Sequence, residues 1–164
     1  MTEAKPDAAS KRPKAASKRR KPARPTPKPK TPPAPRNRVK VSASEVQLVK
    51  RNGRKAKGDG PQGEYWEVRV SEKRAGEVFV NVIDEPPLGR HASLQIFLNK
   101  PDQGRGIGRI AYRMAAEESE HDRIYLHMRK ANVASRTAAE AAGFVDASPP
   151  GITQLILIRD RDGG

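Results

Sequence analysis

The stretch that decides the fold is LNKPDQGRGIG, residues 98–108. An apolar run, Ala92 to Leu98, leads into it, and a segment with apolar residues at helical spacing, Ile107 to Ser119, follows it. Three glycines stand at alternate positions where this predicted helix begins. Glycine adopts positive φ and lets the backbone approach a ligand closely, and successive N–H groups in such a turn form a concave anion site. The stretch therefore predicts an anion-binding loop at the N-terminus of a helix, whose dipole also favours an anion.

Two common phosphate-binding patterns do not fit this loop. The dinucleotide pattern G-x-G-x-x-G fails because Ala111 stands where a third glycine would follow Gly108, and the phosphate-loop ending Gly-Lys-Ser/Thr is absent. Gln103 and Arg105 add side-chain donors to the glycine backbone. The loop resembles the acetyl-CoA signature Gln/Arg-x-x-Gly-x-Gly/Ala of the GNAT acetyltransferase superfamily, matched by Gln103, Gly106 and Gly108.

The composition of the 164-residue chain bounds the classes of function. One domain is the expectation at this length. Cysteine is absent and there are only three histidines, which argues against a disulfide framework, a thiol nucleophile and a metal site. The sequence has no apolar run of membrane-spanning length and no apolar signal segment at its N-terminus, so we expect a cytoplasmic protein without membrane contact.

The net charge of +14 is unevenly distributed. Residues 1–40 carry 14 Lys and Arg against two acidic residues, whereas the remainder is nearly neutral. This segment is rich in Pro and lacks aromatic residues, so it cannot bury enough apolar surface to offset the entropy of ordering. We therefore expect a disordered basic tail, residues 1–41, and a folded domain, residues 42–164. The tail either binds nucleic acid or another polyanion non-specifically through counterion release, or only solubilises the protein.

The domain alternates between strand and helix patterns. Strands are expected near residues 46–49, 65–70, 77–83, 92–98, 124–128 and 152–158. Helices are expected from Ile107 to Ser119 and after Asn132, which can cap a helix that ends at Gly143. Strand, helix and strand in succession make a right-handed crossover, so the strands 92–98 and 124–128 should be parallel. The prediction is an α/β (α+β) fold with a mixed, mostly antiparallel sheet and two main helices.

The second half of the domain strengthens the resemblance to the GNAT superfamily. The strand 124–128 is followed by Asn-x-x-Ser at Asn132 and Ser135 and by a helix that ends in Gly-Phe at residues 143–144. This order is similar to the second signature of the family. The resemblance is specific over residues 92–144.

The resemblance implies that acetyl-CoA, as co-substrate, binds between the strand that ends at Leu98 and the parallel strand 124–128. The backbone at the end of the first strand would pair with the pantetheine arm, and the loop amides would hold the pyrophosphate. The implied cofactor residues are Phe97, Leu98, Asn99, Gln103, Gly104, Arg105, Gly106, Ile107, Gly108, Asn132 and Ser135. Asn132 also fits simple helix capping and Ser135 also fits a small helical residue, so both alternatives stay open.

The resemblance also implies direct attack of an amine on the thioester, with a backbone N–H stabilising the oxyanion. A lysine-like amine has a pKa of about 10.4, so only about one molecule in 2,500 is neutral at pH 7 and a base or a desolvating pocket is required. Many family members carry a tyrosine four residues before the Gly of Gly-Phe, where this chain has Ala139. The catalytic candidates are Tyr125, His127 and Glu85, each with a structural alternative: sheet packing, a partly exposed strand histidine and a solvated loop carboxylate.

The predicted function is acetyl-CoA-dependent N-acetyl transfer to an unknown primary amine. The helices that wall the acceptor site in the family are missing here, because residues 50–64 are rich in Gly and Lys and lack apolar periodicity. An open site favours a protein or peptide amine, and an uncovered sheet face suits a homodimer. The alternative is a non-catalytic CoA-binding or adaptor domain that its tail tethers to nucleic acid or another polyanion.

Overall fold

A computed structural model of the chain describes residues 38–161. The predicted basic tail lies outside the described residues up to residue 37. The folded unit begins before the predicted boundary at residue 42, because Val41 is buried and its N–H donates to the carbonyl of Arg105 at 2.9 Å. Residues 38–41 therefore belong to the domain.

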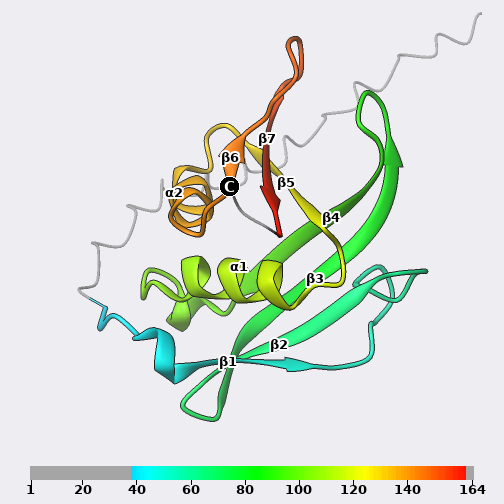
Figure 1. Cartoon of the computed structure of the whole chain (residues 1–164). Helices are drawn as coiled ribbons and strands as arrows, with labels where there is room; N and C mark the ends of the chain where they lie inside the picture. The colour runs from blue at the N-terminus through cyan, green and yellow to red at the C-terminus, as the bar shows by residue number, and fades with distance from the viewer. Residues whose placement is uncertain (1–37, 162–164) are drawn as a thin grey trace, which may run out of the picture. The chain divides into compact units, whose positions relative to one another are not determined.

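Within residues 38–161, seven strands form one sheet in the order β1-β2-β3-β4-β5-β7-β6 (Figure 1). The strands are β1 (Val46–Lys50), β2 (Glu64–Val70), β3 (Lys73–Glu85), β4 (Gly89–Leu98), β5 (Arg123–Arg129), β6 (Val145–Asp146) and β7 (Gln154–Asp160). The helices are α1 (Ile107–Glu118) and α2 (Val133–Ala141), with short 3-10 turns at Ala43–Glu45 and Lys100–Asp102. The pairs in this sheet are antiparallel except β4 with β5, which α1 connects as a crossover. The predicted fold class is confirmed.

The parallel pair is short, and its two strands separate beyond it. Ala92 pairs with Ile124 and Ser93 with Tyr125, and the register found in the described residues ends there. β4 continues along β3, whereas β5 continues along β7 toward α2 (Figure 1). The backbone groups of β4 and β5 that face each other beyond this point are therefore open to another partner.

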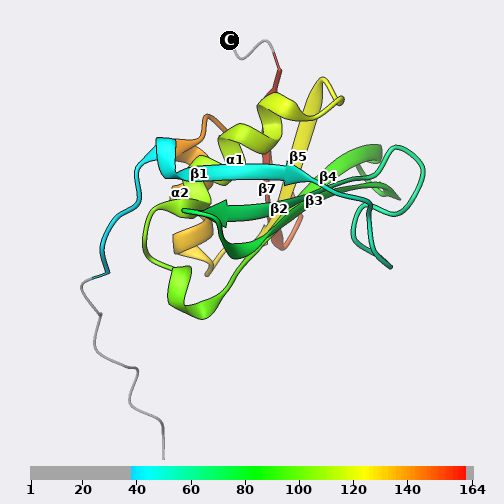
Figure 2. The ribbon, with the colours of Figure 1, turned by 90° about the horizontal axis from the view of Figure 1, so that it is seen from below.

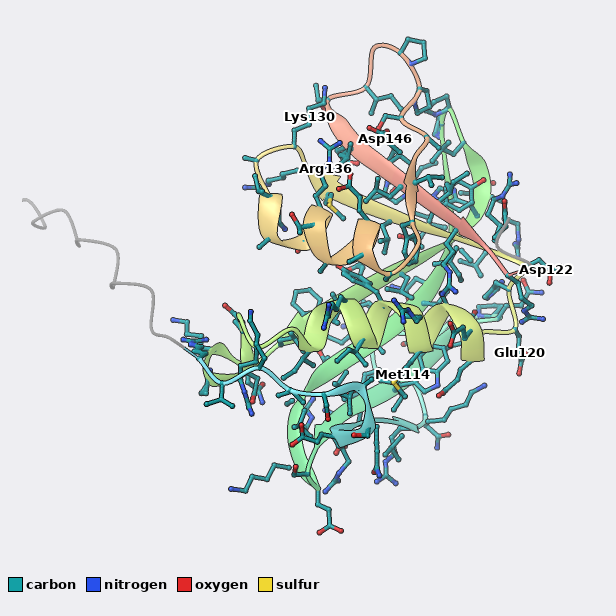
Figure 3. The ribbon with its side chains drawn as sticks, turned by 60° about the vertical axis from the view of Figure 1, so that its left-hand side comes forward. Met114, Glu120, Asp122, Lys130, Arg136 and Asp146 are labelled. Atoms are coloured by element: carbon teal, nitrogen blue, oxygen red, sulfur yellow. The ribbon has the colours of Figure 1, made fainter. Side chains whose placement is uncertain are left out.

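One face of the sheet packs against the two helices. The apolar stripe of α1 is buried at Ile107, Ile110 and Ala111 and joins a core that includes the fully buried Trp66 of β2. Figure 2 shows α1 lying over this face, and Figure 3 shows Met114 on the side of α1 toward β1. No helix of residues 38–161 is long and apolar enough to cross a membrane.

The other face carries a loop, residues 51–63, where the family resemblance would expect helices. No helix lies between β1 and β2 in the described part of the chain, as predicted. The loop is nevertheless fixed to the sheet, because Gly58 N–H donates to Asn81 Oδ1 at 2.7 Å and Asn81 Nδ2 donates to the Ala56 carbonyl at 2.9 Å. The sheet face opposite the helices is thus bordered by an anchored loop.

A buried carboxylate, Glu77 of β3, is the second anchor of this loop. Lys57 from the loop forms an ion pair with it, and Tyr65 Oη donates to it at 2.7 Å. Burial by itself raises the pKa of Glu77, but the hydrogen bonds from Lys57 and Tyr65 and the charges of Lys57 and Arg74 outweigh burial and hold the pKa below its ordinary value. Glu77 is therefore ionised at neutral pH and attracts the loop.

The third strand begins earlier than the predicted 77–83. Ser71 and Glu72 alone make the preceding turn, with φ of 46° and 68°, and β3 follows directly. Gly76 lies inside the strand, where a Cβ would stand 2.1 Å from the carbonyl oxygen of Phe97 on β4. Here glycine permits close pairing of two strands. The sequence pattern alone does not distinguish such a glycine from one in a turn.

Candidate functional site

A cavity of about 690 Å³ opens at the end of β4, beside the glycine loop. Its walls are the end of β4, the glycine loop and parts of α1 and α2. Asn132 caps α2 by accepting a hydrogen bond from Ser135 N–H at 3.3 Å, and Gln103 Nε2 donates to the Leu98 carbonyl at 3.1 Å. The predicted cofactor residues that line the cavity are Phe97, Leu98, Gln103, Gly104, Gly106, Gly108, Asn132 and Ser135.

Two glycines give the loop its shape. Gly104 and Gly106 have φ of 74° and 81°, and Gly106 is the residue that precedes the first turn of α1. No side chain caps this end of α1, so its first N–H groups are free for an anion. Gly108 has no such backbone requirement, because its φ is ordinary and an added Cβ would meet Ala138 Cβ at 3.7 Å. The geometry fits a pyrophosphate at Gly104 and Gly106.

Three other predicted cofactor residues do not line the cavity. Asn99 donates its backbone N–H to the Ala75 carbonyl at 2.8 Å, which extends the pairing of the sheet. Arg105 forms an ion pair with Asp102 at 2.9 Å, and Ile107 is fully buried in the core. These residues shape the loop from outside the cavity.

Lys40 and Tyr112 are two of the eight lining residues that were not predicted as cofactor contacts. Lys40 was assigned to the tail, and Tyr112 of α1 was not singled out. Burial raises the pKa of Tyr112 to about 12, although a hydrogen bond with Ser135 acts in the opposite direction, so its hydroxyl is protonated at neutral pH. The available signal was helical spacing, because Tyr112 lies four residues after Gly108 and therefore on the same side of α1.

Comparison with known proteins identifies this architecture. No protein-family model and no curated protein matches the sequence. Among solved structures, RimJ of Mycobacterium smegmatis in complex with CoA-disulfide matches with a TM-score of 0.50 and 17% identity, over 61% of this chain and 54% of that chain. A chimera of the spermidine N-acetyltransferase SpeG from Vibrio cholerae and hSSAT matches with a TM-score of 0.50 and 21% identity, over 62% and 68%. The chain has the GNAT fold.

The match spans about half the length of the RimJ chain. In this GNAT fold, the second signature forms the end of α2: Gly143 has a φ of 90°, and Phe144 is buried in the core. Ala139, which stands where the resemblance expects a tyrosine, is fully buried and offers no hydroxyl. Any proton transfer must therefore use other side chains.

A pair of histidines lies on the sheet face opposite the helices. His91 of β4 and His127 of β5 are hydrogen-bonded through their Nε2 atoms at 2.8 Å. His91 Nδ1 lies 2.7 Å from the Gly89 carbonyl, which can only accept, so this nitrogen carries a hydrogen. In the neutral pair His127 Nε2 therefore donates to His91 Nε2, and the lone pair of His127 is on Nδ1.

The predicted catalytic candidates gather around this pair. Burial lowers the pKa of His127 and the neighbouring His91 lowers it further, against a hydrogen bond with Gln154 and the charge of Glu85. Tyr125 packs its ring against His91 with centroids 4.7 Å apart, and Glu85 is exposed at the end of β3. His127 is thus neutral at pH 7, and its hydrogen-bond partner His91 is the residue that sequence reasoning missed.

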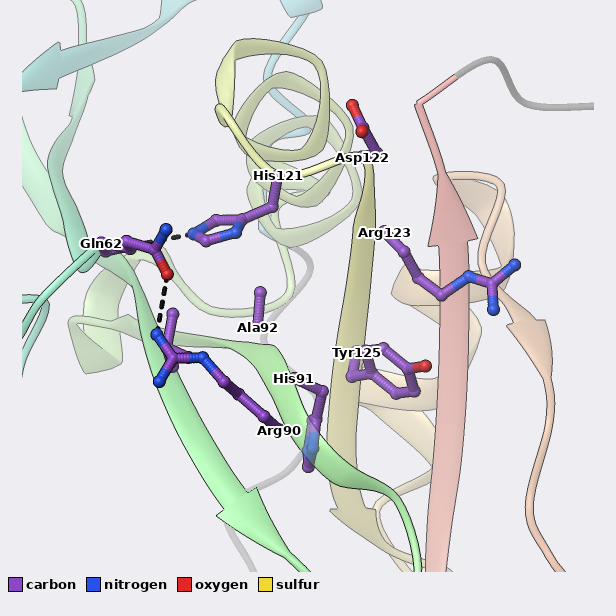
Figure 4. Close-up of a pocket in the computed structure, with 9 residues that line it drawn as sticks. Gln62, Arg90, His91, Ala92, His121, Asp122, Arg123 and Tyr125 are labelled. Atoms are coloured by element: carbon purple, nitrogen blue, oxygen red, sulfur yellow. Dashed lines mark hydrogen bonds between the residues drawn. The ribbon is translucent and has the colours of Figure 1, made fainter.

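A second cavity, of about 320 Å³, lies where β4 and β5 are still paired (Figure 4). His91 lines it. Gln62 holds its rim together by accepting from Arg90 Nη2 at 2.9 Å through its side chain and from His121 Nε2 at 2.9 Å through its carbonyl (Figure 4). His91 therefore links His127 of β5 to the second cavity.

Proposed function

We propose that the protein is an acetyl-CoA-dependent N-acetyltransferase that acts on a primary amine. The observation that carries the proposal is the cavity at the end of β4, which is bordered by the glycine loop at the start of α1. The early end of the pairing between β4 and β5 is the second observation. Open strand edges can pair with the amides of a pantetheine arm, and the loop N–H groups suit a pyrophosphate. The CoA-disulfide in the RimJ structure, which shares the fold, supports this choice of co-substrate.

The cofactor arm would run along the end of β4. The backbone of Phe97 and Leu98 pairs with the pantetheine, while Gly104 and Gly106 direct N–H groups to the pyrophosphate. Ser135 lies across the cavity on α2 and contacts the arm from the opposite wall. This assignment places the cofactor at the glycine loop, where the signature predicts it.

His127 is the proposed general base. Its pKa is lowered, so the ring is neutral at pH 7, and the lone pair on Nδ1 would take the proton of the acceptor ammonium. The amine nitrogen then bonds to the thioester carbon, and a backbone N–H of β4 that faces the gap stabilises the oxyanion. Collapse of the oxyanion breaks the C–S bond, and the attacking nitrogen, which is positively charged after the attack, releases one proton to solvent. This leaves the amide and a thiolate that must be protonated.

We assign the proton for the thiolate to a tyrosine hydroxyl, and two of the three tyrosines of the chain line the two cavities. Tyr125 lines the second cavity, whereas Tyr112 lines the larger one. With a pKa of about 12, Tyr112 carries its proton at neutral pH. We therefore assign the acid role to Tyr112 ahead of Tyr125, and we assign to Glu85 only an influence on the pKa of His127 through its charge.

The proposed acceptor is an amine of a protein or peptide. The acceptor side is bordered by the anchored loop 51–63 instead of helices. Phe97 at the end of β4 is 55% exposed and stacks with Phe79, with ring centroids 6.0 Å apart. An exposed aromatic surface beside an open site suits the apolar part of a lysine side chain or a peptide.

Thiol release from acetyl-CoA tests the proposal with a panel of acceptors: a small polyamine, a lysine-containing peptide, a peptide with a free N-terminus and a folded protein. We expect turnover with a peptide or protein amine. Binding of acetyl-CoA without turnover on any acceptor would favour the alternative, a non-catalytic CoA-binding or adaptor domain. In that alternative, the basic residues 1–40 tether the domain to nucleic acid or another polyanion.

A further inference from the structure

Residues 38–41, here called the strap, lie along the glycine loop and bind its carbonyl groups. Arg38 Nη1 donates to the Gln103 carbonyl, and Lys40 Nζ donates to the Gly104 carbonyl at 3.0 Å. Both contacts join positions more than 60 residues apart in the sequence. The strap therefore contacts the loop through tertiary hydrogen bonds, although it is not part of the glycine signature.

Backbone hydrogen bonds fix the strap in place. Val41 N–H donates to the Arg105 carbonyl at 2.9 Å, and Arg105 Nε donates to the Val39 carbonyl at 3.2 Å. The Val41 side chain is 4% exposed and belongs to the core. Burial of this apolar side chain anchors the strap next to the two glycines with positive φ.

The carbonyl contacts have a consequence for anion binding. When the strap satisfies carbonyl groups of the loop, the loop is held in one conformation, with the first N–H groups of α1 left for a ligand. The Lys40 side chain also covers Gly106, because a Cβ there would lie 4.0 Å from Lys40 Cδ. An ammonium has three N–H donors and Gly104 takes one, so two remain for phosphate oxygens.

The charges at the cavity favour the same ligand. Lys40 and Arg109 are among the residues that line the cavity, and no acidic residue is among them within the described part of the chain. Asp102 of the loop is neutralised by its ion pair with Arg105. Two cations therefore face this end of the cavity without a competing anion.

We propose that the strap completes the acetyl-CoA site: Lys40 pairs with the pyrophosphate, and Arg38 positions the loop that receives it. This inference rests on the proposed use of acetyl-CoA. By composition, residues 38–41 look like the end of a basic tail. In this proposal they belong to the cofactor site. Recognition of the pyrophosphate then depends on a cation from outside the glycine signature.

Calorimetric titration of CoA into the full-length chain tests the inference. We expect Lys40→Gln to weaken binding about 10-fold and Arg38→Gln to weaken it less, whereas Lys40→Arg, which keeps the charge, should restore most of the affinity. Lys55→Gln removes an exposed lysine of the loop 51–63 and should leave affinity unchanged. Equal affinities of the Lys40→Gln and Lys55→Gln variants would overturn the inference, while failure of the unaltered chain to bind CoA would instead remove the proposed function.

Dephospho-CoA, which lacks the 3′-phosphate but keeps the pyrophosphate, locates the contact. We expect Lys40→Gln to weaken dephospho-CoA and CoA by the same factor. A loss that vanishes with dephospho-CoA would place Lys40 on the 3′-phosphate and would contradict the assignment to the pyrophosphate. Melting temperatures of the variants should match that of the unaltered chain, because Lys40 is exposed.

Discussion

The donor side and the acceptor side of this site are built from different parts of the chain. On the donor side, the cavity at the end of β4, one contiguous stretch of residues 98–108 supplies most of the anion site through its backbone. On the acceptor side, the opposite sheet face, the groups are side chains from separate elements, His91 and His127, beside the loop 51–63. A backbone site tolerates changes that keep its φ values, whereas a side-chain site depends on each residue. The two sides should therefore respond differently to substitution.

The largest effect is expected on the donor side from Gly106→Glu. A glutamate at a φ of 81° is strained, and its carboxylate stands where the pyrophosphate is proposed to bind. We expect a loss of CoA affinity of about 100-fold or more, which corresponds to about 2.7 kcal/mol. The measurement is a CoA titration, with circular dichroism to show that the fold persists.

Gly108→Ala is the matched control for that substitution. Gly108 has no positive φ, and the added methyl group would make only an ordinary contact with Ala138. Affinity should change little, because alanine also favours the helix. Similar losses in both variants would show that the loop does not act through its two left-handed glycines.

The next effect is expected on the acceptor side from His127→Ala. Loss of a general base, at the lower end of its usual contribution, costs about 100-fold in turnover, and CoA affinity should remain. The pKa of His127 is lowered from its ordinary value of 6.5. The rate of the unaltered chain should therefore not change with pH near neutrality and should decrease as the pH falls below 6.5. In the variant this decrease should be absent. His121→Ala, which removes a histidine of the second cavity, is the control, and a shared pH profile in all three proteins would rule out the base role.

A smaller effect separates the two tyrosines. Tyr112→Phe should lower turnover about 10-fold or more without changing CoA affinity, because the thiolate loses its proton donor. Tyr125→Phe should have a weaker effect, since its ring packing on His91 remains. If Tyr125→Phe is the more damaging variant, the acid belongs to the second cavity and the assignment to Tyr112 is wrong.

The smallest effect concerns the anchor of the acceptor-side loop. Glu77 has a lowered pKa, so its stabilisation is complete above the ordinary value of 4.5 and is lost as the pH falls through the lower value in the folded state. Glu77→Gln should cost about 1–3 kcal/mol of unfolding free energy at pH 7 and remove this acid dependence. Unfolding curves from pH 3 to pH 7 measure both, and an unchanged acid dependence in the variant would contradict the anchoring role.

The difference between the donor side and the acceptor side also explains which features could be predicted from the sequence. The glycine loop, the stripe of α1 and the cap at Asn132 are local patterns, and the structure places each as expected. The parallel pair followed from the crossover rule. Local sequence patterns therefore predicted the fold and eight of the sixteen residues that line the donor cavity.

Residues that act through tertiary contacts were not predicted. Lys40 lies in a basic segment whose composition indicates disorder, and only the buried Val41 ties it to the loop. His91 looks like an ordinary strand residue until β5 brings His127 to within 2.8 Å of it. Tyr112 was hidden because an aromatic residue on an apolar helix face reads as core. The roles of Lys40 and His91 depend on which elements pack together, and spacing in the sequence does not contain that information.

Calorimetric titration of acetyl-CoA into the full-length chain tests most directly whether the cavity at the end of β4 is a cofactor site. We expect one molecule to bind per chain and Gly106→Glu to abolish the binding, as the loop geometry requires. The absence of binding at about 1 mM acetyl-CoA, where even an affinity of about −4 kcal/mol would be detected, would contradict the proposed function.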